Sequence, residues 1–274
     1  MKLEMNLAWN DALRLLRLNR DVIAVVAGVF FFLPYFAFML IAPDPMAGVS
    51  AAASSDTGAM LERLTAFYGQ VWWVIVVILI LQAVGMLGLI ALLTDRRRPT
   101  VGEALKRGAG KALSYIAAYL LLGMAGTFAL LALVAIASAL GAGALAGLAV
   151  VVGIVVWLVL FVRLSLVPPI LIKENVANPL TALGRSWKLT GGNGVRLFAF
   201  YVLLFVAYLV LLLVISMVLG ALFGLLAPQA AHFGEALVES VLNALWVTGF
   251  LAVLSAVHAQ FAGPSPEALG DTFE

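Results

Sequence analysis

Apolar residues form six long runs along the chain, separated by short polar stretches. The runs cover residues 22–42, 71–94, 114–140, 145–172, 197–223 and 236–260. Each has about 20 or more mostly apolar residues, the length that an α-helix needs to cross the hydrocarbon core of a bilayer. We therefore predict six transmembrane helices, with a kink at Pro34 in the first one. They make residues 1–262 a single membrane domain, followed by an acidic cytoplasmic tail at residues 263–274.

Short amphipathic stretches precede three of these runs. In residues 1–20, one helical face collects Ala8, Trp9, Ala12, Leu13 and Leu16, which predicts a helix lying on the membrane. A cleaved signal peptide is the alternative, but residues 22–42 are apolar for longer than such peptides require. Thr100 and Glu103 match a capping box, which predicts the start of a second short helix. Asn178 and Pro179 predict the start of a third.

The third amphipathic helix is predicted to end at Gly191 and Gly192. Its expected apolar face is Leu180, Leu183, Gly184 and Trp187, with Thr181, Arg185 and Lys188 opposite. Residues 43–70 are expected to form a loop with a short helical piece at residues 60–68.

The sequence thus predicts an all-α polytopic membrane protein, in which six transmembrane helices form three hairpins. A short amphipathic interfacial helix precedes each hairpin. This order suggests three degenerate repeats at residues 1–95, 96–173 and 174–261, since internal repeats are common in membrane folds.

Basic residues are concentrated on one side of this topology. Of the 16 Lys and Arg residues, four lie in the N-terminal segment, six in residues 95–111 and four in residues 173–196. Arg63 lies in the opposite loop, and Arg163 lies within the fourth run. The positive-inside rule therefore predicts that both termini are cytoplasmic.

Arg163 is the charge that interrupts a membrane run, and it is followed by Pro168 and Pro169. The prolines lack amide hydrogens, so the carbonyls of Leu164 and Ser165 lose their helical donors. We expect the Arg163 side chain to serve these carbonyls. Two depths in the bilayer are possible for Arg163. If the helix breaks at Val167, Arg163 lies near the headgroups. If the helix continues to Ile172, Arg163 is buried deeply. The break is favoured.

The stretch around Arg163 resembles the bacterial family called the glycerophosphoryl diester phosphodiesterase membrane domain. The resemblance covers about thirty residues and rests on Arg163-Leu164-Ser165-Leu166, Pro168, Glu174-Asn175, Pro179-Leu180, Ala182 to Thr190 and Gly192-Asn193. It implies a six-span bacterial inner-membrane protein. In some members a soluble phosphodiesterase barrel follows the membrane domain; it is absent here, so that activity is not expected.

Within this stretch we distinguish two groups of candidate residues. Candidates for binding lipid or another anion are Arg163, Arg185, Trp187 and Lys188, although a structural role is favoured for Arg163. The expected structural motif is Pro168, Pro169, Glu174, Asn175, Ser186, Thr190 and Asn193. Elsewhere, Glu239 and Asn243 share one face of the sixth span, where solvation at the outer rim is favoured over a cavity.

Composition narrows the function classes. The chain is 64% hydrophobic and 11% charged, has no cysteine and has two histidines, so we expect no metal site, cofactor or nucleic-acid partner. No nucleophile–base pair or pair of carboxylates is found at one membrane depth, so no catalytic residue is assigned. We predict a non-catalytic protein of the bacterial inner membrane that binds membrane lipid or another amphiphile, or scaffolds envelope assembly with a protein partner in trans. A transporter or export component is the alternative, and a membrane-embedded hydrolase is less favoured.

Overall fold

The chain folds into helices connected by short loops. A computed structural model describes residues 2–42, 57–95, 99–139, 143–223 and 227–263. The helices are α1 (Met5–Leu18), α2 (Arg20–Ala27), η1 (Gly28–Phe32), α3 (Leu33–Ile41), α4 (Thr57–Thr94), α5 (Val101–Ala139), α6 (Gly143–Leu164), α7 (Val167–Lys173), α8 (Pro179–Leu189), α9 (Gly194–Phe223) and α10 (Pro228–Ala262). The described residues contain no strand, and six helical segments are long and apolar enough to cross a membrane. The predicted all-α, six-span architecture is confirmed.

Two predicted boundaries differ from the structure. The short helix expected at residues 60–68 is the beginning of α4, and the second amphipathic helix continues into its span as the single helix α5. No proline interrupts either segment, and a continuous helix satisfies every backbone group at the membrane surface. The capping box is confirmed, because Thr100 N–H donates to Glu103 (2.9 Å) and Glu103 N–H donates to the Thr100 hydroxyl (3.3 Å).

The first span is irregular just before Pro34. A π-helical turn, η1, joins α2 to α3, and the amide of Leu33 bonds to the carbonyl of Gly28. Such turns insert one extra residue into the hydrogen-bond ladder, which changes the bonding register where the proline has no hydrogen to donate. The π turn thus ends directly before α3, whose second residue is Pro34, and the predicted kink at Pro34 stays a prediction. The predicted loop at residues 43–56 and the tail at residues 264–274 lie outside the described residues.

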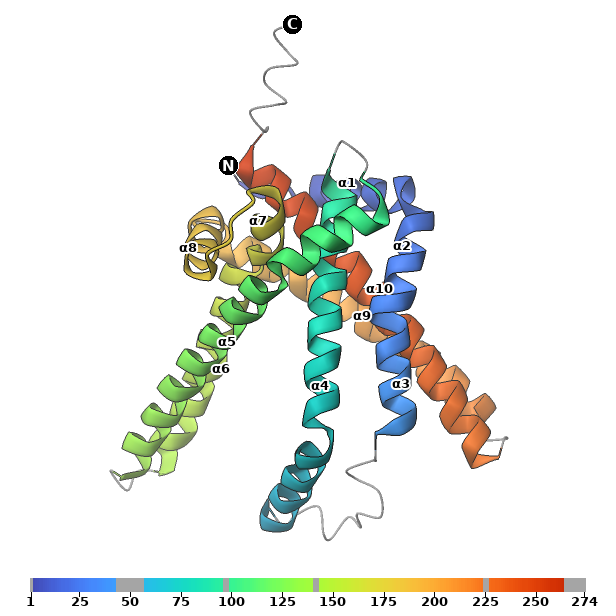
Figure 1. Ribbon diagram of the computed structural model, residues 1–274. Helices are drawn as coiled ribbons and strands as arrows, with labels where there is room; N and C mark the ends of the chain where they lie inside the picture. The colour runs from blue at the N-terminus through green and yellow to red at the C-terminus, as the bar shows by residue number, and fades with distance from the viewer. Residues whose placement is uncertain (1, 43–56, 96–98, 140–142, 224–226, 264–274) are drawn as a thin grey trace, which may run out of the picture.

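The molecule has a packed end and a splayed end (Figure 1). At the packed end, α1, α7 and α8 lie around one end of the long helices, close to the C-terminal turns of α10. From there the α5–α6 pair, α4 with α3, and the α9–α10 pair diverge toward the opposite end. The chain is thus compact on one side and opens into separate legs on the other. The three-repeat hypothesis stays a prediction.

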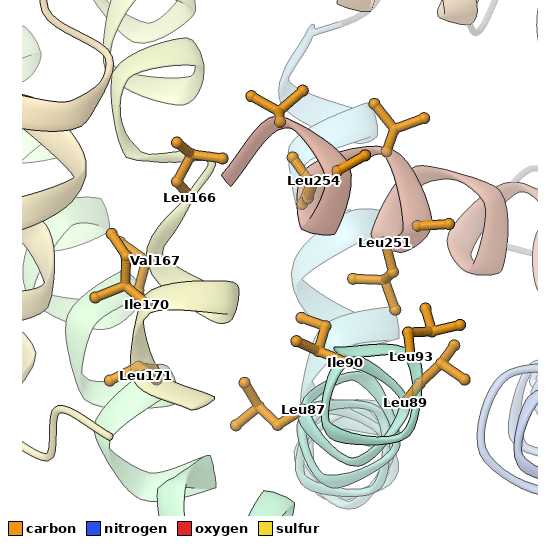
Figure 2. Packing of buried hydrophobic residues seen from close by; sticks show 14 of the residues in the cluster. Leu87, Leu89, Ile90, Leu93, Leu166, Val167, Ile170, Leu171, Leu251 and Leu254 are labelled. Carbon is orange, nitrogen blue, oxygen red and sulfur yellow. The ribbon is translucent and has the colours of Figure 1, made fainter. Parts of the chain in front are cut away.

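Three helices form the core of the packed end. Figure 2 shows one apolar cluster to which these helices contribute side chains. Its members include Leu87 and Ile90 of α4, Leu166 just before α7, Ile170 of α7, and Leu251 of α10. These five side chains are at most 1% exposed. The short helix α7, which forms the last part of the fourth span after the break, is therefore part of the protein core.

Glycine allows α4 and α5 to approach closely. A Cβ added at Gly108 would lie 2.6 Å from the carbonyl oxygen of Val84 and 2.7 Å from the backbone nitrogen of Gly88. Both atoms belong to the α4 backbone, which has no rotamer to change. The small residues thus bring two helix backbones into contact, as is common between membrane helices.

The N-terminal segment packs on α10. Ala8 and Ala12 of the predicted membrane-facing side of α1 are buried, while Trp9 is exposed. The Gln260 side chain pairs with the backbone of Glu4, accepting from its N–H (3.3 Å) and donating to its carbonyl (3.1 Å). Part of the face expected to contact lipid therefore contacts protein.

Candidate functional site

The helix break after Arg163 is closed by hydroxyl groups. Helix α6 ends at Leu164 and α7 begins at Val167, so the favoured break is confirmed and lies at residues 165–166. The Arg163 carbonyl accepts from the hydroxyls of Ser186 (2.8 Å) and Thr190 (3.2 Å), which both come from α8 and its cap. The two hydroxyls thereby fix α8 against the last turn of α6.

Pro168 and Pro169 occupy the first turn of α7. Helix N-termini do not use the amide hydrogens that proline lacks, so the double proline starts a helix as well as ending one. At the break itself, the Ser165 hydroxyl lies 2.9 Å from both the Val162 carbonyl and the Tyr201 hydroxyl. The break is therefore built from ordinary side-chain hydrogen bonds.

The Arg163 side chain does not serve the carbonyls of Leu164 and Ser165, and that expectation is wrong. Its guanidinium lies over the Trp187 ring, 4.8 Å from the centroid, and donates to the Trp187 carbonyl at 3.4 Å. The aromatic face and the last carbonyls of α8 both attract a cation. Among the described residues, this long bond is the only hydrogen bond that the guanidinium makes. Most of its N–H donors therefore have no partner there.

Backbone turns bring Arg163 next to the start of α9. Helix α8 ends at Leu189 with Thr190 as its cap, shortly before the predicted Gly191 and Gly192. Gly192 lies in the turn that follows and has a left-handed φ of +75°, which glycine adopts at little cost. Cβ positions at Gly191 and Gly194 would lie 3.8 Å from the guanidinium. In the same turn, Asn193 is buried and accepts from the amide of Leu3 at 3.0 Å. The N-terminal segment therefore fixes the turn that surrounds Arg163.

Helix α8 packs on the protein through small residues. The predicted cap is confirmed, since the Asn178 side chain accepts from the amides of Leu180 (2.9 Å) and Thr181 (3.4 Å). Ala182 and Ser186 are fully buried, whereas Leu180 and Trp187 of the expected apolar face are 65% and 42% exposed. The apolar pattern thus marks the outward side of α8, where lipid would lie, and small residues make the protein contact.

Glu174 joins two segments far apart in the sequence. Its carboxylate accepts from Arg185 Nε at 2.8 Å and lies 3.1 Å from His258 Nε2 of α10. Burial by itself would raise the pKa of Glu174, but the hydrogen bonds and charges of Arg185 and His258 bring it below its ordinary value. Arg185 is therefore engaged in an ion pair, and its role as a headgroup ligand stays a prediction.

His258 was missing from the candidate residues. It is 1% exposed, and no pattern in the sequence links it to Glu174, which is 84 positions away. A lone histidine near the end of an apolar run predicts only packing or capping. The tertiary structure alone brings it to Glu174.

The loop between α7 and α8 is attached to α5. Asn175 has a left-handed φ of +52°, a conformation that asparagine tolerates better than most residues. Lys111 donates to the Asn175 carbonyl (3.2 Å), and the Ser114 hydroxyl donates to the Ala177 carbonyl (2.6 Å). Five of the seven residues of the expected structural motif thus bond to other segments at the packed end: Glu174 to α10, Asn175 to α5, Ser186 and Thr190 to α6, and Asn193 to Leu3. Pro168 and Pro169 are buried within α7.

Two cations remain exposed beside Arg163. Lys188, which follows the exposed Trp187 in sequence, and Arg196, in the first turn of α9, are exposed and make no ion pair with another described residue. No group of three or more His, Asp or Glu side chains placed to hold a metal occurs within the described ranges. The geometry therefore offers a basic, aromatic surface formed by Arg163, Trp187, Lys188 and Arg196, which we call the α8 basic surface.

Comparison of the chain with protein-family models, curated proteins and solved structures gives no match.

Proposed function

We propose that this chain is a non-catalytic, multi-pass protein of the bacterial inner membrane whose α8 basic surface binds the phosphate of anionic lipid headgroups. The observation that carries the proposal is the Arg163–Trp187 pair, with a ring-to-cation distance of 4.8 Å and guanidinium donors left unused. Arginine presents its N–H groups in a planar fork that matches phosphate oxygens. Stacking on Trp187 orients that fork without consuming it.

The surroundings of the pair support a lipid ligand. Leu180 and Trp187 project outward from α8 and provide an apolar surface that acyl chains and the interfacial region would cover. Lys188 and Arg196 add exposed positive charge at the same end of the molecule. A ligand that contacts both sets must carry an anionic group next to an apolar body, which describes an anionic phospholipid.

The distribution of charge supports a cytoplasmic position for this surface. Arg63 lies at the start of α4, at the splayed end, while the other basic residues of the described segments lie in residues 2–20, in the first turns of α5, and between the end of α6 and the start of α9. These elements share the packed end (Figure 1). By the positive-inside rule, the packed end and both termini face the cytoplasm.

A lipid-retention experiment tests the proposal. We expect native mass spectra of the wild-type protein to retain phosphatidylglycerol and the double variant Arg163→Gln/Lys188→Gln to lose it at least roughly tenfold, since each basic residue near anionic lipid contributes about 1 kcal/mol. Arg63→Gln removes the same charge at the other end and serves as the matched control. Inorganic phosphate is the second probe: displacement of the lipid by phosphate alone would identify the phosphate as the recognised group. Equal retention by all three proteins would refute the proposal.

Arg185→Gln separates binding from positioning. Because Arg185 is paired with Glu174, its loss is expected to lower thermal stability while the retained lipid changes less than in the double variant. Loss of lipid at unchanged stability would instead place Arg185 among the binding residues.

A further inference from the structure

The N-terminal segment enters the packed end just before α1 begins. Residues 2–4 precede α1 and belong to no helix, and we call them the N-terminal strap. Lys2 and Glu4 are exposed, whereas Leu3 is 5% exposed and belongs to the hydrophobic core cluster. The strap therefore inserts the side chain of Leu3 into the protein and leaves the side chains on either side of it outside.

Hydrogen bonds attach the strap to two segments that are distant in the sequence. The amide of Leu3 donates to the side-chain oxygen of Asn193 at 3.0 Å, and this bond is buried. The amide of Glu4 donates to the side chain of Gln260 at 3.3 Å, and the Glu4 carbonyl accepts from the same side chain at 3.1 Å. The strap thus joins the end of α10 to the turn between α8 and α9, at the packed end of the molecule (Figure 1).

The hydrogen bonds of Asn193 continue from the strap toward Arg163. The Asn193 amide donates to the carbonyl of Thr190 at 3.1 Å, and its carbonyl accepts from the amide of Leu197 in the first turn of α9 at 2.9 Å. The Thr190 hydroxyl in turn donates to the Arg163 carbonyl at 3.2 Å. A series of hydrogen bonds therefore leads from the strap, through the turn, to the residue whose guanidinium lies over Trp187.

The strap is the part of this arrangement that can detach most easily. A segment outside the helices, held by a few hydrogen bonds and one buried side chain, opens at a lower free energy than the helices that it contacts. Its release would take the Leu3 donor away from Asn193, which is 5% exposed. Because a buried polar group that loses its partner is costly, we expect the turn to rearrange when the strap leaves, while the spans stay folded.

We propose that docking of the N-terminal strap regulates lipid binding at the α8 basic surface. With the strap docked, the turn holds Arg163 over Trp187 in the arrangement that binds lipid phosphate, and with the strap released the surface binds the phosphate more weakly. This inference rests on the function proposed for that surface. Since coupling between two sites is reciprocal, bound lipid stabilises the docked strap by the same factor by which docking strengthens lipid binding.

Hydrogen exchange tests the coupling in the wild-type protein. The amides of Leu3 and Glu4 donate the bonds to Asn193 and Gln260, so the rate at which they exchange with deuterium reports docking of the strap. We expect phosphatidylglycerol in mixed micelles to slow this exchange at least roughly fivefold, which is the lower end of typical couplings. Phosphatidylcholine has no net charge and is the matched control. Equal exchange rates in the two kinds of micelle would overturn the proposal.

Substitutions test the same coupling from the side of the strap. Leu3→Pro removes the donor to Asn193, because proline has no amide hydrogen, and we expect native mass spectra to show at least a roughly fivefold loss of phosphatidylglycerol. Lys2→Pro is the matched control, since the Lys2 amide makes no hydrogen bond with another described residue. Equal retention by the two proline variants would overturn the proposal.

Asn193→Ala removes the acceptor of the same hydrogen bond. The combined variant Leu3→Pro/Asn193→Ala is therefore expected to lose no more lipid than the more affected of the two single variants. Losses that add in the combined variant would show that the two residues act separately, which would contradict the proposed route from the strap to the turn.

Arg163→Gln separates positioning from a general loss of stability. If the strap acts through Arg163, adding Leu3→Pro to Arg163→Gln lowers lipid retention no further; a further loss would overturn the proposal. Equal retention by the wild type and Arg163→Gln/Lys188→Gln would refute the proposed function and the coupling with it. Loss of lipid from that double variant, with full retention by Leu3→Pro, would refute the coupling alone.

Discussion

The packed and splayed ends of the molecule are held together by different forces. In the most apolar 18-residue stretch of α10, 61% of the residues are buried inside the protein. In the corresponding stretches of α5 and α9, none is buried (0%). At the packed end, close backbone approach, hydroxyl bonds and an ion pair fix the helices. At the splayed end, most apolar side chains would meet acyl chains, which are as apolar as the side chains and provide no drive for helix association.

The α8 basic surface lies at the packed end, where contacts within the chain position Arg163 and Trp187. Four substitution experiments test the comparison.

Truncation of a core leucine is expected to have the largest effect. Leu251 is 1% exposed in the packed end and Leu211 of α9 is 49% exposed, so the same change to alanine leaves a cavity only at the first site. We expect Leu251→Ala to lower the free energy of unfolding by roughly 2–4 kcal/mol and Leu211→Ala by less than about 1 kcal/mol. Thermal or denaturant unfolding in detergent measures both, and equal losses would mean that the two ends are not packed differently.

Adding a methyl group at the α4–α5 crossing comes next. In Gly108→Ala the new Cβ meets the α4 backbone at 2.6 Å, so the helices must separate, at a cost of roughly 1–3 kcal/mol. Gly110→Ala on the same helix has no neighbouring atom within 4 Å, and it is expected to be neutral or stabilising by up to about 1 kcal/mol through helix propensity. If Gly108→Ala were as stable as Gly110→Ala, the close crossing would be wrong.

Loss of the Glu174 charge should give a smaller, pH-dependent effect. The folded state lowers the pKa of Glu174 below its ordinary value of 4.5, so the ionised form stabilises the fold above that pH. This stabilisation disappears as the pH falls through the lowered pKa. Glu174→Gln is expected to lose about 1 kcal/mol at neutral pH, a modest value because Arg185 is 43% exposed.

Melting curves of the wild type and Glu174→Gln between pH 3 and 7 provide the measurement for this ion pair. The two curves should converge at the acidic end and separate above it. A constant difference at all pH values would show that the carboxylate charge is not what joins α8 to α10.

The smallest effect is expected at the α6 break. A double-mutant cycle with Ser165→Ala and Tyr201→Phe measures the coupling of the two hydroxyls, which lie 2.9 Å apart. Hydrogen bonds between membrane helices contribute about 0.6 kcal/mol on average, and we expect a coupling energy near that value. Additive single-variant effects would show that the hydroxyls do not stabilise each other.

Local sequence patterns predicted much of the fold. The six apolar runs, the capping box at Thr100, the Asn178 cap and the glycine turn after α8 each depend on residues within a few positions of one another. These features follow from backbone hydrogen bonding and from the cost of exposing polar backbone to lipid. The same reasoning located the helix break between Arg163 and the double proline.

The sequence by itself therefore determined an all-α chain with six membrane-spanning helices and a short motif that interrupts the fourth. Only the tertiary structure decided what each polar group of that motif contacts. The Arg163 guanidinium lies over Trp187, and the Arg163 carbonyl accepts from the hydroxyls of Ser186 and Thr190. The Glu174 carboxylate pairs with Arg185 and His258. Local sequence patterns do not show which apolar face of a membrane helix packs on protein, because lipid solvates every apolar face equally well. Contacts between helices depend instead on small residues and single polar groups, whose partners lie dozens of positions away.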